Sequence, residues 1–140
     1  MNFKNIHLGK MIEQCVAEKN IDIARICNFM KEDEREIQEM YRKENLPTDI
    51  VLKWSKLLEY DFFRIFSQHL ILYAPPESPK RNRRKINSSM PHFRKNIYTK
   101  EIIDFILDQL NTGEMTKTQV IQQYNIPKTT LYKWIYKYQN

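Results

Sequence analysis

Glycine, cysteine and histidine are scarce in this chain, at 2, 2 and 3 of its 140 residues. Scarce glycine, beside plentiful long apolar residues, lysine, glutamate and glutamine, favours helices over sheet. Cys15 and Cys27 are not spaced like metal ligands, and each lies on an apolar face, so we expect two small buried hydrophobic side chains. The histidines, His7, His69 and His92, are scattered, and we assign them no chemical role.

Long hydrophobic runs are also missing. No stretch of 18 apolar residues occurs, and the first ten residues, MNFKNIHLGK, lack the apolar segment of a signal peptide. The sequence therefore predicts a cytoplasmic protein with no membrane partner.

Catalytic patterns are absent too. The sequence contains no glycine-rich phosphate loop and no Ser/His/Asp arrangement. Asp104 and Asp108 stand one helical turn apart and could share a metal ion, but no third acidic ligand lies nearby, so we expect both to face solvent. We therefore predict no enzyme activity, no cofactor and no metal site. We expect the chain to act by binding a partner and not by catalysis.

Positive charge is present, and it is unevenly distributed. With 41% hydrophobic and 29% charged residues, the chain has the composition of one or two small domains. Residues 1–70 carry 11 basic and 12 acidic side chains, whereas residues 71–100 carry 8 and 1. No carboxylate occurs after residue 114. The positive potential therefore belongs to the middle segment and to the last two predicted helices.

Residues 115–138 are the most informative stretch, because they predict two short helices joined by a tight turn. Thr116 and Gln119 have the spacing of a capping box, which begins a helix at Lys117. The apolar face of this first helix consists of Val120, Ile121 and Tyr124.

The turn and the second helix follow directly. Asn125 tolerates the positive φ that a reversal needs, Ile126 can pack into the core, and Pro127 suits the first turn of a helix. The apolar residues then recur at i, i+3, i+4 and i+7, a complete helical stripe. This stripe consists of Leu131, Trp134, Ile135 and Tyr138.

The opposite face of the second helix carries hydroxyl groups, rings and cations. Its residues are Lys128, Thr129, Thr130, Tyr132, Lys133, Tyr136 and Lys137. The pattern indicates a helix-turn-helix, although an αα-hairpin with a polar face is the alternative. The segment IPKTTLYKWIYKY resembles the helix-turn-helix of insertion-sequence transposases. The positions that carry this resemblance are Val120, Ile121, Asn125, Ile126, Thr130, Leu131 and Trp134.

The resemblance implies double-stranded DNA as the partner, with the second helix in the major groove. We expect phosphate contacts from Lys128, Lys133 and Lys137. We expect Thr129, Thr130 and Tyr132 to meet base edges, where Thr or Tyr can pack on thymine methyl groups. Transposases of this kind cut DNA with a separate large domain, so the resemblance implies a recognition subunit that acts with a catalytic transposase subunit.

The segment 1–71 predicts five short helices, each with an apolar face. We expect the later four to begin near Asp22, Asp33, Thr48 and Asp61. Their number and spacing resemble the DNA-binding domain of phage repressors. The residues at the spacing of the helix-turn-helix of that class are Ile26, Cys27, Met30, Ile37 and Met40.

This first half departs from the repressor pattern where DNA would be touched. Lys31 occupies the turn position that is usually glycine, and Glu32 the position of an apolar plug. The helix that would enter the groove begins with the acidic run 33–36, interrupted only by Arg35, and phosphates repel such a surface. We expect this domain to bind a protein partner, such as a second copy of itself. DNA contact and a purely structural role remain the alternatives.

The segment 72–98 has no helical periodicity and contains prolines and serines, so we interpret it as a flexible linker. It contains five cations in six residues: Lys80, Arg81, Arg83, Arg84 and Lys85. This arm could neutralise phosphates or enter a minor groove, and a solvated linker is the alternative.

The sequence also predicts a helix from Lys100 to about Leu110, capped by Thr99. This is the third helix that a helix-turn-helix unit needs to enclose a core. The fold that we predict is all-α, with a five-helix domain at 1–71, the basic linker at 72–98 and a helix-turn-helix unit at 99–140. The function that we predict is recognition of a DNA sequence, as the non-catalytic subunit of a transposition system that is associated with the nucleoid. A transcriptional regulator is one alternative, and a protein-interaction module that uses the acidic first domain is another.

Overall fold

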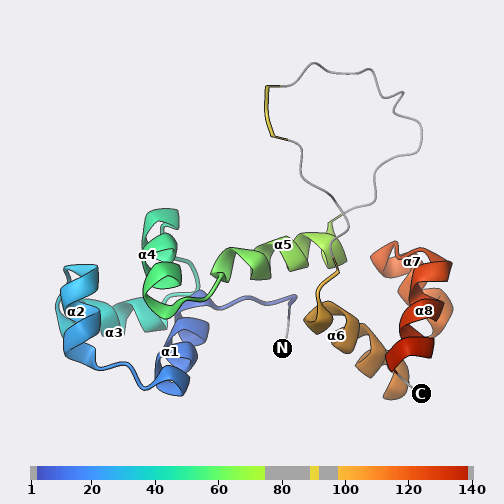
Figure 1. Cartoon of the computed structure of the whole chain (residues 1–140), viewed down its shortest axis with the longest axis horizontal. Coiled ribbons are helices and arrows are strands. Elements are labelled where there is room, and N and C mark those ends of the chain that lie inside the picture. Colours follow the sequence, from blue (N-terminus) through green and yellow to red (C-terminus); the bar gives the residue numbers. More distant parts are fainter. Residues whose placement is uncertain (1–2, 75–88, 92–97, 139–140) are drawn as a thin grey trace. The chain divides into compact units, whose positions relative to one another are not determined.

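The computed structural model describes residues 3–74, 89–91 and 98–138, and within these it contains eight helices and no strand (Figure 1). The predicted all-α class is therefore confirmed. The chain divides into two compact units, residues 2–67 and residues 68–140 together with Met1. The division falls inside one helix, whereas the sequence places the end of the first domain at residue 71.

Five helices lie in the first 73 residues. They are α1 (Leu8–Lys19), α2 (Ile23–Met30), α3 (Glu34–Arg42), α4 (Thr48–Leu58) and α5 (Phe62–Tyr73). The predicted starts are confirmed to within one residue. Two of the aspartates at these starts also cap their helices with their side chains. The Asp33 and Asp61 carboxylates accept hydrogen bonds from the Glu36 and Arg64 amides, at 2.9 and 3.2 Å. Asp22 makes no such bond.

The core of the unit 2–67 comes from the apolar faces that the helical spacing predicts. Trp54, Ile12 and Ile37 are fully buried at its centre, and the Tyr41 and Trp54 rings lie 5.8 Å apart between centroids. The other buried residues of this cluster are Leu8, Cys15, Ile26, Met30, Met40, Val51, Leu57, Leu58, Phe62 and Ile65. The prediction that Cys15 is buried is confirmed, while Cys27 is only half-buried.

The helices α1 and α3 meet backbone to backbone at Gly9. The amides of Leu8 and Gly9, which have no partner inside α1, donate to the carbonyls of Glu44 and Lys43, both at 3.0 Å. A β-carbon on Gly9 would collide with the carbonyl oxygens of Met40, Tyr41 and Lys43. Glycine is thus the residue that lets the start of α1 approach the end of α3.

The turn between α2 and α3 begins with a non-glycine residue at positive φ. Lys31 adopts a left-handed conformation with φ of 61°, at the position where the resemblance to repressors predicts glycine. Glu32 is exposed and does not pack into the core. The outward surface at the start of α3 is acidic, as predicted, with Asp33, Glu34 and Glu36 exposed.

The unit 68–140 contains the last six residues of α5 and three further helices, α6 (Lys100–Asn111), α7 (Lys117–Tyr124) and α8 (Lys128–Tyr138). Its core includes Ile102, Ile106, Val120, Ile126 and Leu131, each at most 2% exposed. The side chains of Asp104 and Asp108 are exposed on α6, as predicted.

The end of α5 is a fourth helical segment in the packing of this unit, and the sequence did not predict this contribution. The amide of Gln68, a buried polar side chain, donates to the Thr99 hydroxyl at 2.7 Å. Thr99 therefore precedes α6 as expected but does not cap it with its side chain. The Tyr73 ring packs edge-on against Tyr124, with 6.0 Å between centroids, and the Tyr124 hydroxyl donates to Gln109 at 2.8 Å.

The apolar spacing in α5 predicts one inner face made of Phe62, Ile65, Phe66 and Leu70, but two of these four residues are exposed. Phe66 is 38% exposed and Leu70 is 62% exposed, whereas Gln68 is buried. The interpretation of α5 as a helix with one simple inner face was therefore wrong. Its buried side changes along its length because Phe62 and Ile65 belong to one core and Leu72 to the other.

The close approach at Gly9 predicts a large effect for a single methyl group. Gly9→Ala should lower the free energy of unfolding by about 1 to 3 kcal/mol, because the three carbonyl oxygens are backbone atoms that cannot move aside freely. Urea denaturation of the full chain measures the change. Lys10→Ala, at the exposed neighbouring position, is the control and should stay within about 0.5 kcal/mol of the native protein. Equal stability of both variants would contradict the packing described.

The environment of Tyr73 predicts a dependence on alkaline pH. Burial, and then Tyr124, raises the pKa of Tyr73 from 10.0 to about 12. The stability from this group is complete below pH 10 and is lost as the pH rises toward about 12. We expect Tyr73→Phe to lose less stability than the native chain over that interval in denaturation experiments at graded pH. Tyr136→Phe should follow the native chain. Identical curves for the Tyr73 variant and the native chain would refute this assignment.

Candidate nucleic-acid interface

The start of α7 is fixed by the predicted capping box. The Gln119 amide donates to the Thr116 hydroxyl at 3.3 Å, and the Gln119 side chain accepts from the Thr116 amide at 2.8 Å. These two bonds satisfy donors that an isolated helix end would leave unpaired. The position of Lys117, the first residue of α7, follows from this cap.

The turn between α7 and α8 has the predicted chemistry. Asn125 adopts a left-handed conformation with φ of 51°, and Ile126 is buried, so both predictions are confirmed. Pro127 lies one position earlier than expected, just outside α8, and its carbonyl accepts from the Leu131 amide at 3.1 Å. The two helices are therefore separate elements and not one continuous rod.

The buried side of α8 orients the rest of the helix. Leu131 and Trp134 are buried, and Trp134 packs edge-on against the Tyr98 ring at 4.9 Å between centroids. Ile135 is half-buried. Tyr138 was predicted to complete this stripe but is 42% exposed. Two buried residues one turn apart are enough to decide which face looks outward.

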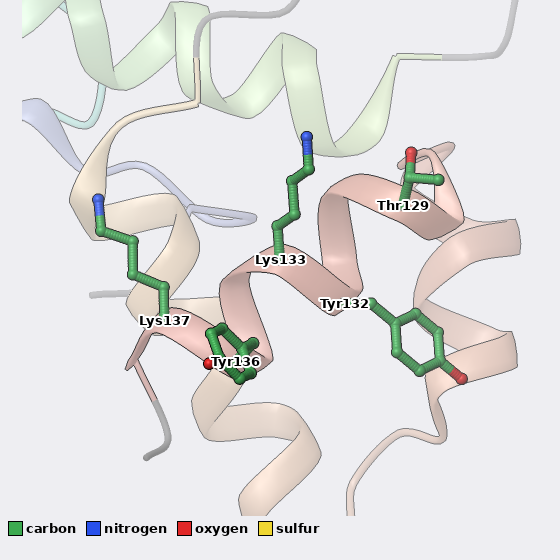
Figure 2. Close-up of a pocket in the computed structure, with 5 residues that line it drawn as sticks. All are labelled: Thr129, Tyr132, Lys133, Tyr136 and Lys137. Carbon is green, nitrogen blue, oxygen red and sulfur yellow. The ribbon is translucent and has the colours of Figure 1, made fainter.

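The outward face of α8 forms an open concavity, the α8 groove, which Figure 2 shows with its lining side chains. These are Thr129, Tyr132, Lys133, Tyr136 and Lys137. All five are exposed, and the lining is mostly apolar surface. The groove thus combines two tyrosine rings, a threonine hydroxyl group and two ammonium groups on one helix.

The lysines at the starts of the two helices converge on one ring of this groove. The ammonium groups of Lys117, in α7, and Lys128, in α8, lie 5.3 and 5.8 Å from the centroid of the Tyr132 ring. A cation within about 6 Å of a ring centroid is attracted by the ring quadrupole. Tyr132 is therefore held by contacts from both helices.

The structure brings together most of the α8 residues that the sequence predicts to contact DNA. Thr129, Tyr132, Lys133 and Lys137 line the groove, and Lys128 stands beside it. Thr130 is half-buried and does not line the groove. The other predicted contacts, Lys80, Arg81, Arg83, Arg84 and Lys85, lie outside the described residues.

Two residues of this surface were not among the predicted contacts. Tyr136 follows Tyr132 by one helical turn, and the sequence placed it on the outward face but assigned it no contact. Lys117 could not have been found from helical spacing, because its contact with Tyr132 joins two different helices.

Comparison with family models, curated proteins and solved structures finds no match to the chain. Within the part of the chain that the structure describes, no group of three or more His, Cys, Asp or Glu side chains is arranged to hold a metal ion. Over the same residues, no helix combines the length and apolarity needed to cross a lipid bilayer.

The left-handed turn predicts a difference between two substitutions at one position. Asn125→Val should destabilise the chain by about 1 to 2 kcal/mol, because a β-branched side chain clashes with its own backbone at positive φ. Asn125→Gly should retain the native stability to within about 1 kcal/mol, since glycine adopts this conformation freely. Chemical denaturation measures both. The turn geometry would be contradicted if the valine variant were as stable as the glycine variant.

Proposed function

We propose that the unit 68–140 binds double-stranded DNA through a helix-turn-helix made of α7 and α8. The observation that carries this proposal is the exposed, cationic and hydroxyl-bearing face of α8, on a helix with no carboxylate. The separation of α7 from α8 at Asn125 supports it, since the second helix of such a pair must project to enter a major groove.

The expected contacts follow from the position of each side chain on α8. Lys133 and Lys137, on the outer face, bind phosphates, as does Lys128 at the start of the helix. Thr129 and Tyr132 meet base edges from the first turns, where recognition helices make their base contacts. Thr130 makes a smaller base contact than Thr129 and Tyr132, because it is half-buried.

The organisation that we propose has an N-terminal helical domain at 1–71, a basic linker at 72–98 and the DNA-binding unit at 99–140. The linker supplies five further cations, at 80–85, for phosphates or a minor groove. The contacts of Gln68 and Tyr73 indicate that a DNA-binding fragment should retain the end of α5.

Within DNA binding, the role that we propose is sequence recognition in a transposition system, supported by the resemblance of the α7–α8 segment to insertion-sequence transposases. A catalytic transposase subunit is then a partner, and the acidic start of α3 favours protein contact over DNA contact for the first unit. Selection of bound fragments from genomic DNA tests this role. Enrichment of inverted repeats that flank a transposase reading frame supports it, whereas enrichment of promoters identifies a transcriptional regulator.

Point substitutions test the DNA-binding face. Thr129→Ala combined with Tyr132→Ala should reduce the preference for the selected site over random duplex by about 1 to 3 kcal/mol for each lost base contact. Lys137→Ala should weaken binding to both duplexes similarly and reduce the slope of log affinity against log salt by about one. Salt titrations with labelled duplexes measure both effects.

Lys56→Ala is the matched control, an exposed lysine in the other unit, and should leave both quantities unchanged. Binding that is unaffected by the α8 substitutions, or that is absent at low salt, would show that this face does not bind DNA.

A further inference from the structure

Tyr136 differs from every other tyrosine of the chain. It is 77% exposed, the largest exposed fraction among the aromatic residues that the structure describes as exposed. Among the described residues, its ring contacts neither another ring nor a cation. The seven remaining tyrosines each have such a contact: Tyr41, Tyr60, Tyr73, Tyr98, Tyr124, Tyr132 and Tyr138. The Tyr136 ring is therefore without an aromatic or cationic partner among the described residues and is largely open to a ligand.

The position of Tyr136 distinguishes it from a ring that is merely on the surface. It lines the α8 groove together with Tyr132, and Lys133 and Lys137 line the same groove. Figure 2 shows the two rings leaving α8 separately, with neither stacked on the other. The groove offers two aromatic surfaces one helical turn apart, each with an ammonium group as a sequence neighbour.

This combination suits unpaired bases better than paired ones. In a duplex the faces of the bases are covered by their neighbours, which stack about 3.4 Å apart along each strand. Rings that are separated by one helical turn, about 5.4 Å, cannot face successive stacked bases. An unstacked strand can extend to that spacing, and aromatic side chains then replace the lost stacking while cations bind the backbone.

We propose that the α8 groove is also a binding site for unpaired nucleobases, which stack on Tyr136 and Tyr132 while Lys133 and Lys137 bind the flanking phosphates. The ligand class is single-stranded nucleic acid or a locally opened duplex. This activity uses the same helix as the proposed duplex recognition but does not depend on it, because stacking involves base faces and duplex recognition involves base edges.

The contacts of Tyr132 fit this role. The ammonium groups of Lys117 and Lys128 lie 5.3 and 5.8 Å from the centroid of its ring. When a strand binds, the same ammonium groups lie close enough to the ring to move to phosphates beside the stacked base. Tyr136 has no such contacts to break, so its ring is the first surface available to a base.

The test compares oligothymidylate, which does not pair with itself, with a blunt duplex and with the same duplex carrying one unpaired thymidine. Full-length native protein and a Tyr136→Ala variant are titrated against each labelled probe at low salt. Tyr136→Ala should lower the affinity for oligothymidylate about five- to a hundred-fold and leave the affinity for the blunt duplex within about twofold. Tyr136→Phe should retain the native affinity, because the ring and not the hydroxyl group stacks.

Phe29→Ala is the control for loss of an exposed aromatic side chain, since Phe29 lies in α2, outside the groove, and is 43% exposed. It should leave binding to all three probes unchanged. A loss on the thymidine-bulged duplex as well as on oligothymidylate would extend the site to bases extruded from a duplex, and a loss on oligothymidylate alone would restrict it to free strands.

The inference is overturned if the native chain does not bind oligothymidylate, or if Tyr136→Ala weakens all three probes equally or none. These experiments distinguish a failure of this inference from a failure of the proposed function. Binding to oligothymidylate that depends on Tyr136, in a chain that prefers no duplex sequence, would refute sequence recognition and retain the single-strand site.

Discussion

The outward face of α8 depends on the burial of Leu131 and Trp134 on its other side. These two residues, with Ile126 in the turn, tie α8 to the core of its unit. Because they stand one helical turn apart, they fix the rotation of the helix, and Thr129, Tyr132, Lys133 and Lys137 then face solvent by geometry alone. The proposed interface is a consequence of core packing and needs no special arrangement of its own.

The chain contains two helix pairs of similar design and opposite surface charge. Both α2–α3 and α7–α8 are joined by a residue in the left-handed conformation, Lys31 in one and Asn125 in the other. The second helix begins with an acidic surface in the first pair and with a cationic one in the last. Backbone geometry alone therefore does not assign DNA binding, and the charge of the exposed face separates the two pairs.

The local features of this fold were predictable, and the features that depend on distant residues were not. The capping box at Thr116 and the turn at Asn125 involve neighbours in the sequence, so their spacing reveals them. The bond between Gln68 and Thr99 joins residues 31 positions apart, and it reverses the expected burial of α5, where Gln68 is buried and Leu70 exposed. The same limit applies to the groove, where the contact between Lys117 and Tyr132 crosses from one helix to another.

The central claim is that the exposed face of α8 is the surface of this protein that nucleic acid covers. Titration of duplex DNA into the isotope-labelled full chain, followed by nuclear magnetic resonance of the backbone amides, tests it most directly. The account predicts that the largest shift changes fall on the exposed residues of α8 and on the start of α7. Changes concentrated on α3, or a spectrum that DNA leaves unaltered at low salt, would contradict it.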